Sequence, residues 1–102
     1  MQLGGCDAFA LNGIGIVQAA FPRSYNDKIK SSFKSQIEEV SSASKDCIVV
    51  YYRLDGYKEH MAKAIGPRKA QSKFGDLGNV YEHPIHNTPY GKGGIRFFRV
   101  KT

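Results

Sequence analysis

Side chains that could move protons and stabilise a phosphoryl transition state gather near the C-terminal end of the chain. His83 and His86 stand three residues apart, and Tyr90 and Arg96 follow them. Histidine can serve as general base or general acid, while arginine stabilises the charge of a pentacovalent phosphate, so a metal is not needed. We therefore predict His83, His86, Tyr90 and Arg96 as catalytic residues, with one histidine as the base and the other as the acid.

The net charge of +6 lies entirely in the same part of the chain. Residues 1–56 carry six basic and six acidic groups, whereas residues 57–102 carry nine basic and three acidic groups together with all three histidines. Basic side chains interleaved with aromatic ones are typical of proteins that bind phosphate-bearing partners. The predicted phosphate-binding residues are Arg68, Lys69, Lys73, Lys92 and Arg99. The alternative is a solvated basic face that only keeps the protein soluble.

These features point to RNA or another phosphate-rich ligand as the partner. RNA supplies its own nucleophile, the 2′-hydroxyl, so a protein that cleaves it needs neither a nucleophile nor a cofactor. In composition and architecture the chain resembles small metal-independent ribonucleases, including bacterial toxin domains, and the resemblance implies an endoribonuclease. The alternative is a non-catalytic module that binds nucleic acid, a nucleotide or an acidic protein partner, like an inhibitor from a phage or mobile element.

A second kind of chemistry is offered by Cys6, which follows Gly4-Gly5 and opens an apolar segment. A cysteine at a helix N-terminus has a lowered thiol pKa, and the backbone N–H groups there can bind an oxyanion. This segment resembles the nucleophile segment of papain-like cysteine hydrolases, in which a glutamine shortly before the cysteine, here Gln2, helps form the oxyanion hole. Residues 90–96 are similar to the closing strand of that family. The chain departs from the pattern of this family at the general base, because no histidine is followed by the apolar strand that usually carries the base. The alternative interpretation of Cys6 is a buried free thiol.

No metal site is predicted. The His-x-x-His spacing of His83 and His86 is compatible with zinc, but neither Cys6 nor Cys47 completes a second ligand pair. Cys47 lies in an apolar run and is expected to be buried. Two cysteines are too few for a disulfide framework, so a reducing, cytoplasmic compartment is expected. No apolar run reaches about 18 residues and no signal peptide is visible, so no membrane association is expected.

The predicted fold class is α+β, as a single domain over residues 1–102. Its clearest element is a long helix over residues 24–45, because Ile29, Phe33, Ile37 and Val40 recur at helical spacing. Ser24 with Asp27 three residues later resembles a capping box. The helix is expected to pack on a mainly antiparallel sheet of about four strands.

Those strands are expected on both sides of a glycine-rich stretch. Residues 47–54 predict a buried central strand, and residues 79–86 an edge strand, because Pro84 lacks the N–H that a central strand uses. Residues 95–101 predict the last strand.

The remaining segments leave alternatives open. Residues 57–65 predict a short helix, with a hairpin through Asp55-Gly56 as the competing interpretation, and residues 66–78 predict a loop. Residues 6–21 fit either a hairpin turning at Asn12-Gly13 or a helix.

Overall fold

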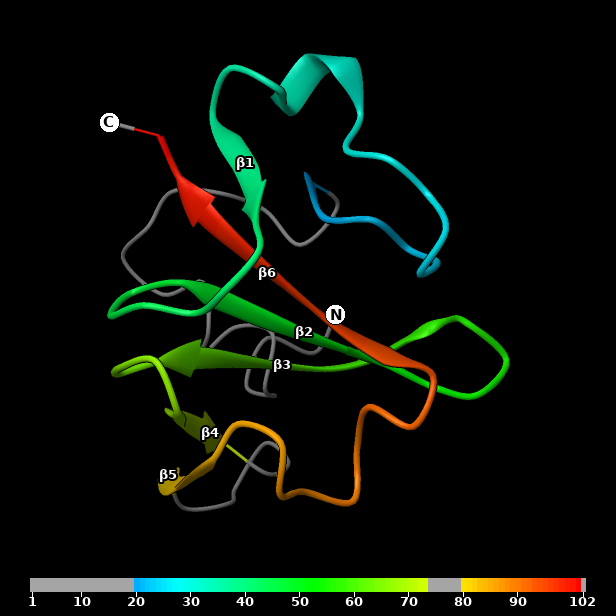
Figure 1. Ribbon diagram of the computed structural model, residues 1–102. Helices are drawn as coiled ribbons and strands as arrows, with labels where there is room; N and C mark the ends of the chain where they lie inside the picture. The colour runs from blue at the N-terminus through cyan, green and yellow to red at the C-terminus, as the bar shows by residue number, and fades with distance from the viewer. Residues whose placement is uncertain (1–19, 74–79, 102) are drawn as a thin grey trace.

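The computed structural model describes residues 20–73 and 80–101, which form one sheet with antiparallel pairing throughout (Figure 1). Across the sheet the strands run in the order β1-β6-β2-β3-β4-β5. Strands β2 to β5 are therefore a meander, and the C-terminal strand returns to lie between β1 and β2. The bounds are β1 (Ile37–Val40), β2 (Ile48–Tyr52), β3 (Lys58–Ala64), β4 (Lys69–Lys73), β5 (Val80–Pro84) and β6 (Gly94–Val100).

The predicted α+β class is wrong, because the long helix over residues 24–45 does not form and the sheet has six strands where about four were expected. That segment holds only a 3₁₀ turn, η2 (Ser31–Phe33), before β1 begins. The carboxylate of Asp27 accepts the N–H of Ser24 at 3.2 Å, as it would in a capping box, yet the chain does not continue as a helix. Six serines between residues 31 and 44 disfavour helix, because serine competes for backbone hydrogen bonds.

The apolar spacing in this segment marked burial rather than helical conformation. Ile29 and Phe33 pack against the same apolar cluster that buries Ile37. Val40 contacts a different cluster on the other side of the sheet. This is expected, because Val40 and Ile37 are three positions apart in β1 and side chains alternate between the two faces of a strand. A helical stripe would have placed all four on one side.

The short helix predicted over residues 57–65 is also wrong, and the competing hairpin is what the structure contains. The chain turns through Asp55 and Gly56, whose φ of 90° suits glycine, and continues as β3. A bulge between Tyr51 and Tyr52 shifts the register, so that Tyr51 pairs with His60 and Tyr52 with Lys58. The predicted loop over 66–78 is confirmed for residues 66–68 and wrong where β4 runs, whereas residues 74–78 lie outside the described residues. Most of residues 6–21 also lie outside them.

Three strand predictions are confirmed. All five residues of β2 are buried, and β2 lies between β6 and β3 near the middle of the sheet. Strand β5, which contains Pro84, is at one edge. Strand β6 closes the described chain, and Cys47, just before β2, is buried as expected.

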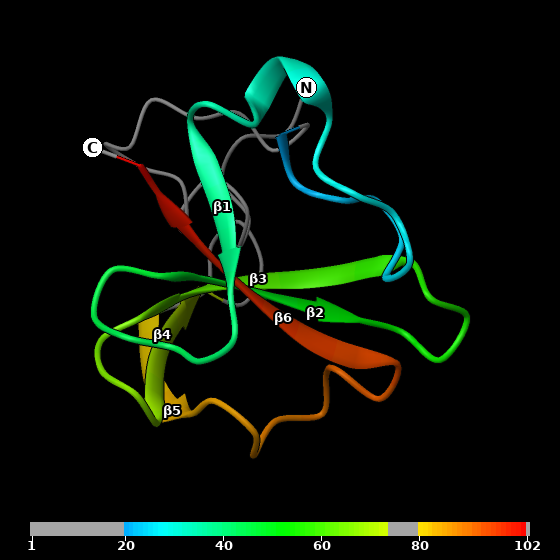
Figure 2. The same ribbon diagram turned by 45° about the horizontal axis from the view of Figure 1, so that its top comes forward.

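Each side of the sheet carries its own apolar cluster. On the side that we name the Phe98 face, Ile37, Phe98 and neighbouring strand residues are covered by Ala20 and Phe21. The Tyr51 face carries the residues that alternate with these, such as Val49 and Tyr51. Figure 2 shows β4 and β5 running at a steep angle to β2 and β3. Ile85, just after β5, packs in the cluster of the Tyr51 face, and the Tyr51 hydroxyl donates to its carbonyl oxygen at 2.8 Å.

Gly93, just before β6, lies so close to the neighbouring backbone that no side chain fits at this position. A Cβ at this position would lie 1.6 Å from the carbonyl oxygen of Arg53, while the Gly93 N–H donates to the Tyr52 carbonyl at 2.8 Å. We expect Gly93→Ala to lower the free energy of unfolding by about 2 kcal/mol or more, because the backbone must shift. Urea titration followed by circular dichroism measures this change. Gly66→Ala is the matched control, since nothing lies within 4 Å of its added Cβ, and equal losses in both variants would contradict the explanation.

Among residues 20–73 and 80–101, no helix is long and apolar enough to span a membrane.

Candidate functional site

A chain of hydrogen bonds joins three polar side chains on the Tyr51 face. His60 Nε2 lies 3.1 Å from Ser72 Oγ, and Ser72 Oγ lies 2.6 Å from His83 Nε2. His83 Nδ1 lies 2.9 Å from the carbonyl oxygen of Pro84. These side chains come from three consecutive strands, β3, β4 and β5, and we name them the His60 cluster.

The acceptors fix where the protons of the cluster sit. The Pro84 carbonyl can only accept, so His83 donates its Nδ1 proton to it. In neutral His83, Nε2 is then an acceptor and receives the Ser72 hydroxyl proton. Ser72 Oγ in turn accepts the Nε2 proton of His60, which leaves the lone pair of a neutral His60 ring on Nδ1.

Strand periodicity places these residues together. His60, Ala62 and Ala64 alternate along β3 on the Tyr51 face, and Ala70 and Ser72 do so along β4. In the β4–β5 register His83 lies opposite Ala70. Small alanines beside the histidines leave room for the imidazole rings to approach Ser72.

Burial controls the charge of His60, whose residue surface is 3% exposed. Burial, with a smaller contribution from the nearby His83, lowers the pKa of His60 to about 4. His60 is therefore uncharged at neutral pH. Its ring stacks on Tyr90 with centroids 4.3 Å apart and lies 5.6 Å from the Tyr51 ring. These contacts and Ser72 fix both the plane of the imidazole and its tautomer.

The predicted catalytic residues lie on opposite faces. His83 belongs to the His60 cluster and Tyr90 stacks on it. His86 is exposed and meets Phe97 of the Tyr51 face edge-on, at 6.3 Å between centroids. Arg96, in contrast, points to the Phe98 face, since it alternates with Phe97 along β6. The structure therefore brings the three tyrosine and histidine residues to one face and leaves Arg96 out.

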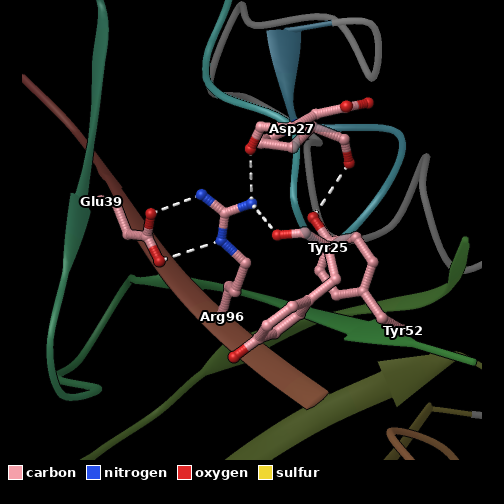
Figure 3. Close-up of polar contacts among 6 residues, drawn as sticks. Tyr25, Asp27, Glu39, Tyr52 and Arg96 are labelled. Atoms are coloured by element: carbon pink, nitrogen blue, oxygen red, sulfur yellow. Dashed lines mark hydrogen bonds and ion pairs between the residues drawn. The ribbon is translucent and has the colours of Figure 1, made fainter. Parts of the chain in front are cut away.

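Arg96 links three segments of the chain on that other face (Figure 3). Its Nε and Nη2 donate to the Glu39 carboxylate of β1, and its Nη1 donates to the carbonyl oxygens of Tyr25 and Asp27, each at 2.9 Å. The guanidinium also lies 5.2 Å from the centroid of the Phe98 ring. Hydrogen bonding to Glu39 raises the pKa of Arg96. This arrangement holds the 25–27 segment against the sheet.

The predicted phosphate-binding residues are spread over several elements. Arg68 and Lys69 are exposed where β4 begins, and Lys73 is the last residue of β4. Lys92 is exposed in the loop before β6. Arg99 is on β6 and pairs with Glu38 of β1.

The sequence interpretation missed His60, the most deeply buried of the three histidines. Its signal is visible in the sequence: Met61, Ala62 and Ala64 follow it, all buried in β3. The expectation that no histidine is followed by an apolar strand is therefore wrong. Cys6, the predicted nucleophile of the same resemblance, lies outside the described residues.

Metal-ligating side chains do not cluster in the part of the chain that the structure describes, where no group of three histidine, cysteine or acidic residues could hold an ion.

Comparison with known proteins adds no further constraint. No known protein family, curated protein or solved structure matches this chain. Its function must be inferred from its own residues.

Proposed function

We propose that the protein is a cysteine-dependent hydrolase of acyl bonds, with His60 as the general base and Cys6 as the nucleophile. The observation that supports it best is a buried, uncharged histidine whose Nε2 is hydrogen-bonded to Ser72 on the neighbouring strand. A nucleophile–base–orienting residue set is the arrangement that recurs in such enzymes. The part of Cys6 rests on the sequence, where it follows two glycines in a segment that resembles the papain-like nucleophile.

The tautomer of His60 suits the role of base. Because the Nε2 proton is donated to Ser72, Nδ1 is the ring nitrogen that would accept the thiol proton. Ser72 is a positioning residue, and the Tyr90 ring stacked on the imidazole restrains its plane. At pH 7 His60 is neutral, as a general base must be before it accepts a proton.

The proposed reaction runs in two steps. The thiol of Cys6 gives its proton to His60 as the sulfur attacks the carbonyl carbon of the substrate, forming a tetrahedral oxyanion. The oxyanion collapses to a thioester, and the leaving amine or alcohol takes the proton from the His60 imidazolium. Water then attacks the thioester, giving a proton to His60, and the thiol leaves with that proton as the carboxylic acid is released.

Metal-independent cleavage of RNA is the second candidate. It is supported by the presence of His83, His86 and Tyr90 on one face of the sheet. In this proposal one histidine removes the proton of the 2′-hydroxyl and the other protonates the leaving oxygen. Both ring nitrogens of His83 are hydrogen-bonded in the structure, so His83 would have to release Ser72 or Pro84 to act.

Two activities measured on the same variants distinguish these candidates. We expect the protein to hydrolyse p-nitrophenyl esters, and we expect Cys6→Ala and His60→Ala each to lower kcat/KM by about 100-fold or more, since each removes a participant in the attack. RNA cleavage in the presence of EDTA, assayed with His86→Ala, tests the second candidate. Cys47→Ala is the matched thiol control, because Cys47 is 1% exposed.

The outcome that contradicts the hydrolase is ester hydrolysis that survives unchanged in Cys6→Ala. RNA cleavage that Cys6→Ala retains and His86→Ala loses would establish the ribonuclease instead. Circular dichroism of each variant separates loss of chemistry from loss of fold.

A further inference from the structure

A basic groove lies on the side of the molecule away from the His60 cluster. Two hollows of about 630 Å³ and 550 Å³ share Arg23 and Lys58 in their linings, so they adjoin each other. The first is walled by Phe21 and Pro22, and Phe21 belongs to the apolar cluster of the Phe98 face. We name as the basic groove the side chains Arg23, Lys28, Lys30, Arg53, Tyr57 and Lys58.

Positive charge is in excess along this groove. Among its cations, Arg53 pairs with Asp55 at 2.9 Å. Asp27 is the acidic residue of the lining, and one of its carboxylate oxygens accepts the Ser24 N–H. Within residues 20–73 and 80–101, no carboxylate pairs with Arg23, Lys28 or Lys30, and all three are exposed. Exposed cations gathered in this way attract an anionic ligand.

An aromatic ring stands beside these cations. Tyr57 is 51% exposed, and the Arg53 guanidinium lies 6.0 Å from the centroid of its ring. The ring shares the smaller hollow with Arg23 and Lys58. An exposed ring flanked by cations is the platform on which nucleic-acid bases stack.

Backbone hydrogen bonds hold the two sides of the groove together. The Lys58 N–H donates to the Arg23 carbonyl at 2.8 Å, and the Tyr25 N–H donates to the Gly56 carbonyl at 2.7 Å. These bonds join the 20–27 segment to the β2–β3 hairpin, which carries Tyr57. The cations and the ring are therefore presented in a fixed arrangement, which lowers the entropy lost when a ligand binds.

We propose that this groove binds a single-stranded nucleic acid. Phosphates lie along Arg23, Lys28, Lys30 and Lys58, and one base stacks on Tyr57. Adjoining hollows with cations along both fit a chain of phosphates better than a single anion, and the exposed ring favours an unpaired base over a duplex, whose bases are already stacked. The groove does not include the His60 cluster, so the proposal stands independently of the hydrolase.

Fluorescence anisotropy with a labelled ten-nucleotide poly-U RNA tests the charge contribution. We expect Arg23→Glu/Lys30→Glu to weaken binding at least about 10-fold at 0.1 M salt. The matched control is Arg68→Glu/Lys69→Glu, which makes the same change in net charge at exposed positions on β4 and before it. A much smaller loss in the control supports the groove, and equal losses in the two double variants overturn it in favour of diffuse electrostatics.

The base-stacking contribution is tested at Tyr57. Tyr57→Ala is expected to weaken single-strand binding about 5- to 10-fold and to leave binding to a duplex of equal length unchanged, while Tyr57→Phe retains both. Equal weakening for single strand and duplex in Tyr57→Ala overturns the single-strand assignment. RNA and DNA strands are compared directly to identify the sugar preference. Binding to vesicles containing phosphatidylserine that matches or exceeds binding to the strand would assign the groove to a membrane surface and overturn the proposal.

Discussion

Replacing Arg96 with methionine should lower the free energy of unfolding by about 2–3 kcal/mol. The guanidinium donates to the Glu39 carboxylate and to the carbonyls of Tyr25 and Asp27, and its side chain is 11% exposed. Methionine is unbranched and of similar length, but it carries no donor for these acceptors and no cation over the Phe98 ring. We place the loss below that of a fully buried ion pair, because the Glu39 side chain is 43% exposed and water can reach it. Urea denaturation followed by circular dichroism measures the change.

Arg99→Met is the matched control for this prediction. Arg99 is on the same strand and also pairs with a glutamate of β1, Glu38, but its side chain is 60% exposed. An exposed ion pair contributes about 0–1 kcal/mol, so the control should lose little. Equal losses at Arg96 and Arg99 would show that the contacts to Tyr25 and Asp27 carry no stability.

The two arginines, which the sequence placed in one predicted site, have different surroundings in the structure. Arg96 and Arg99 look alike in a short basic and aromatic run, and both were assigned to the site by charge alone. Their separation by three positions places them on opposite faces of β6. The partner of Arg96, Glu39, is 57 positions away in the sequence, and no residue near either of them indicates that they pair.

Strand predictions succeeded where the local pattern matched the environment. The run of β-branched and aromatic residues in β2 reflects burial on both faces, and Pro84 excluded a central position for β5. The helix prediction failed because Ile29, Phe33 and Ile37 report only that this side of the segment is buried. Pairing of β1 with β6, at the other end of the chain, decided the conformation instead.

The sequence predicted only part of the candidate site, because it selected residues by their type. His83 and Tyr90 were singled out by residue type, and both contact the His60 cluster. His60 and Ser72 were not, because the residues around His60 had been assigned to a short helix. In that helix, the alternation of His60 with Met61 across two faces could not be seen. Correct strand assignment for residues 58–64 would have placed His60 on the same face as Ala62 and Ala64.

Lowering the pH from 6.5 to 4 should destabilise the protein by about 2–3 kcal/mol through His60 alone. In the folded protein burial lowers the pKa of His60 to about 4, whereas an unfolded chain has an ordinary histidine pKa near 6.5. Between these values the unfolded state binds a proton that the folded state does not. Stability is therefore complete above pH 6.5, falls as the pH drops through this window, and changes no further from this group below pH 4.

Unfolding free energies of the wild type and His60→Gln at pH 7, 5.5 and 4.5 isolate this contribution, because other acidic groups titrate in both proteins. Glutamine keeps an N–H donor for Ser72 and carries no titrating ring. We expect the loss between pH 7 and 4.5 to be smaller in His60→Gln, whereas exposed His86→Gln should follow the wild type. Identical pH profiles for the wild type and His60→Gln would mean that His60 is not held neutral by the fold. Its assignment as the base would then rest only on its contacts with Ser72 and Tyr90.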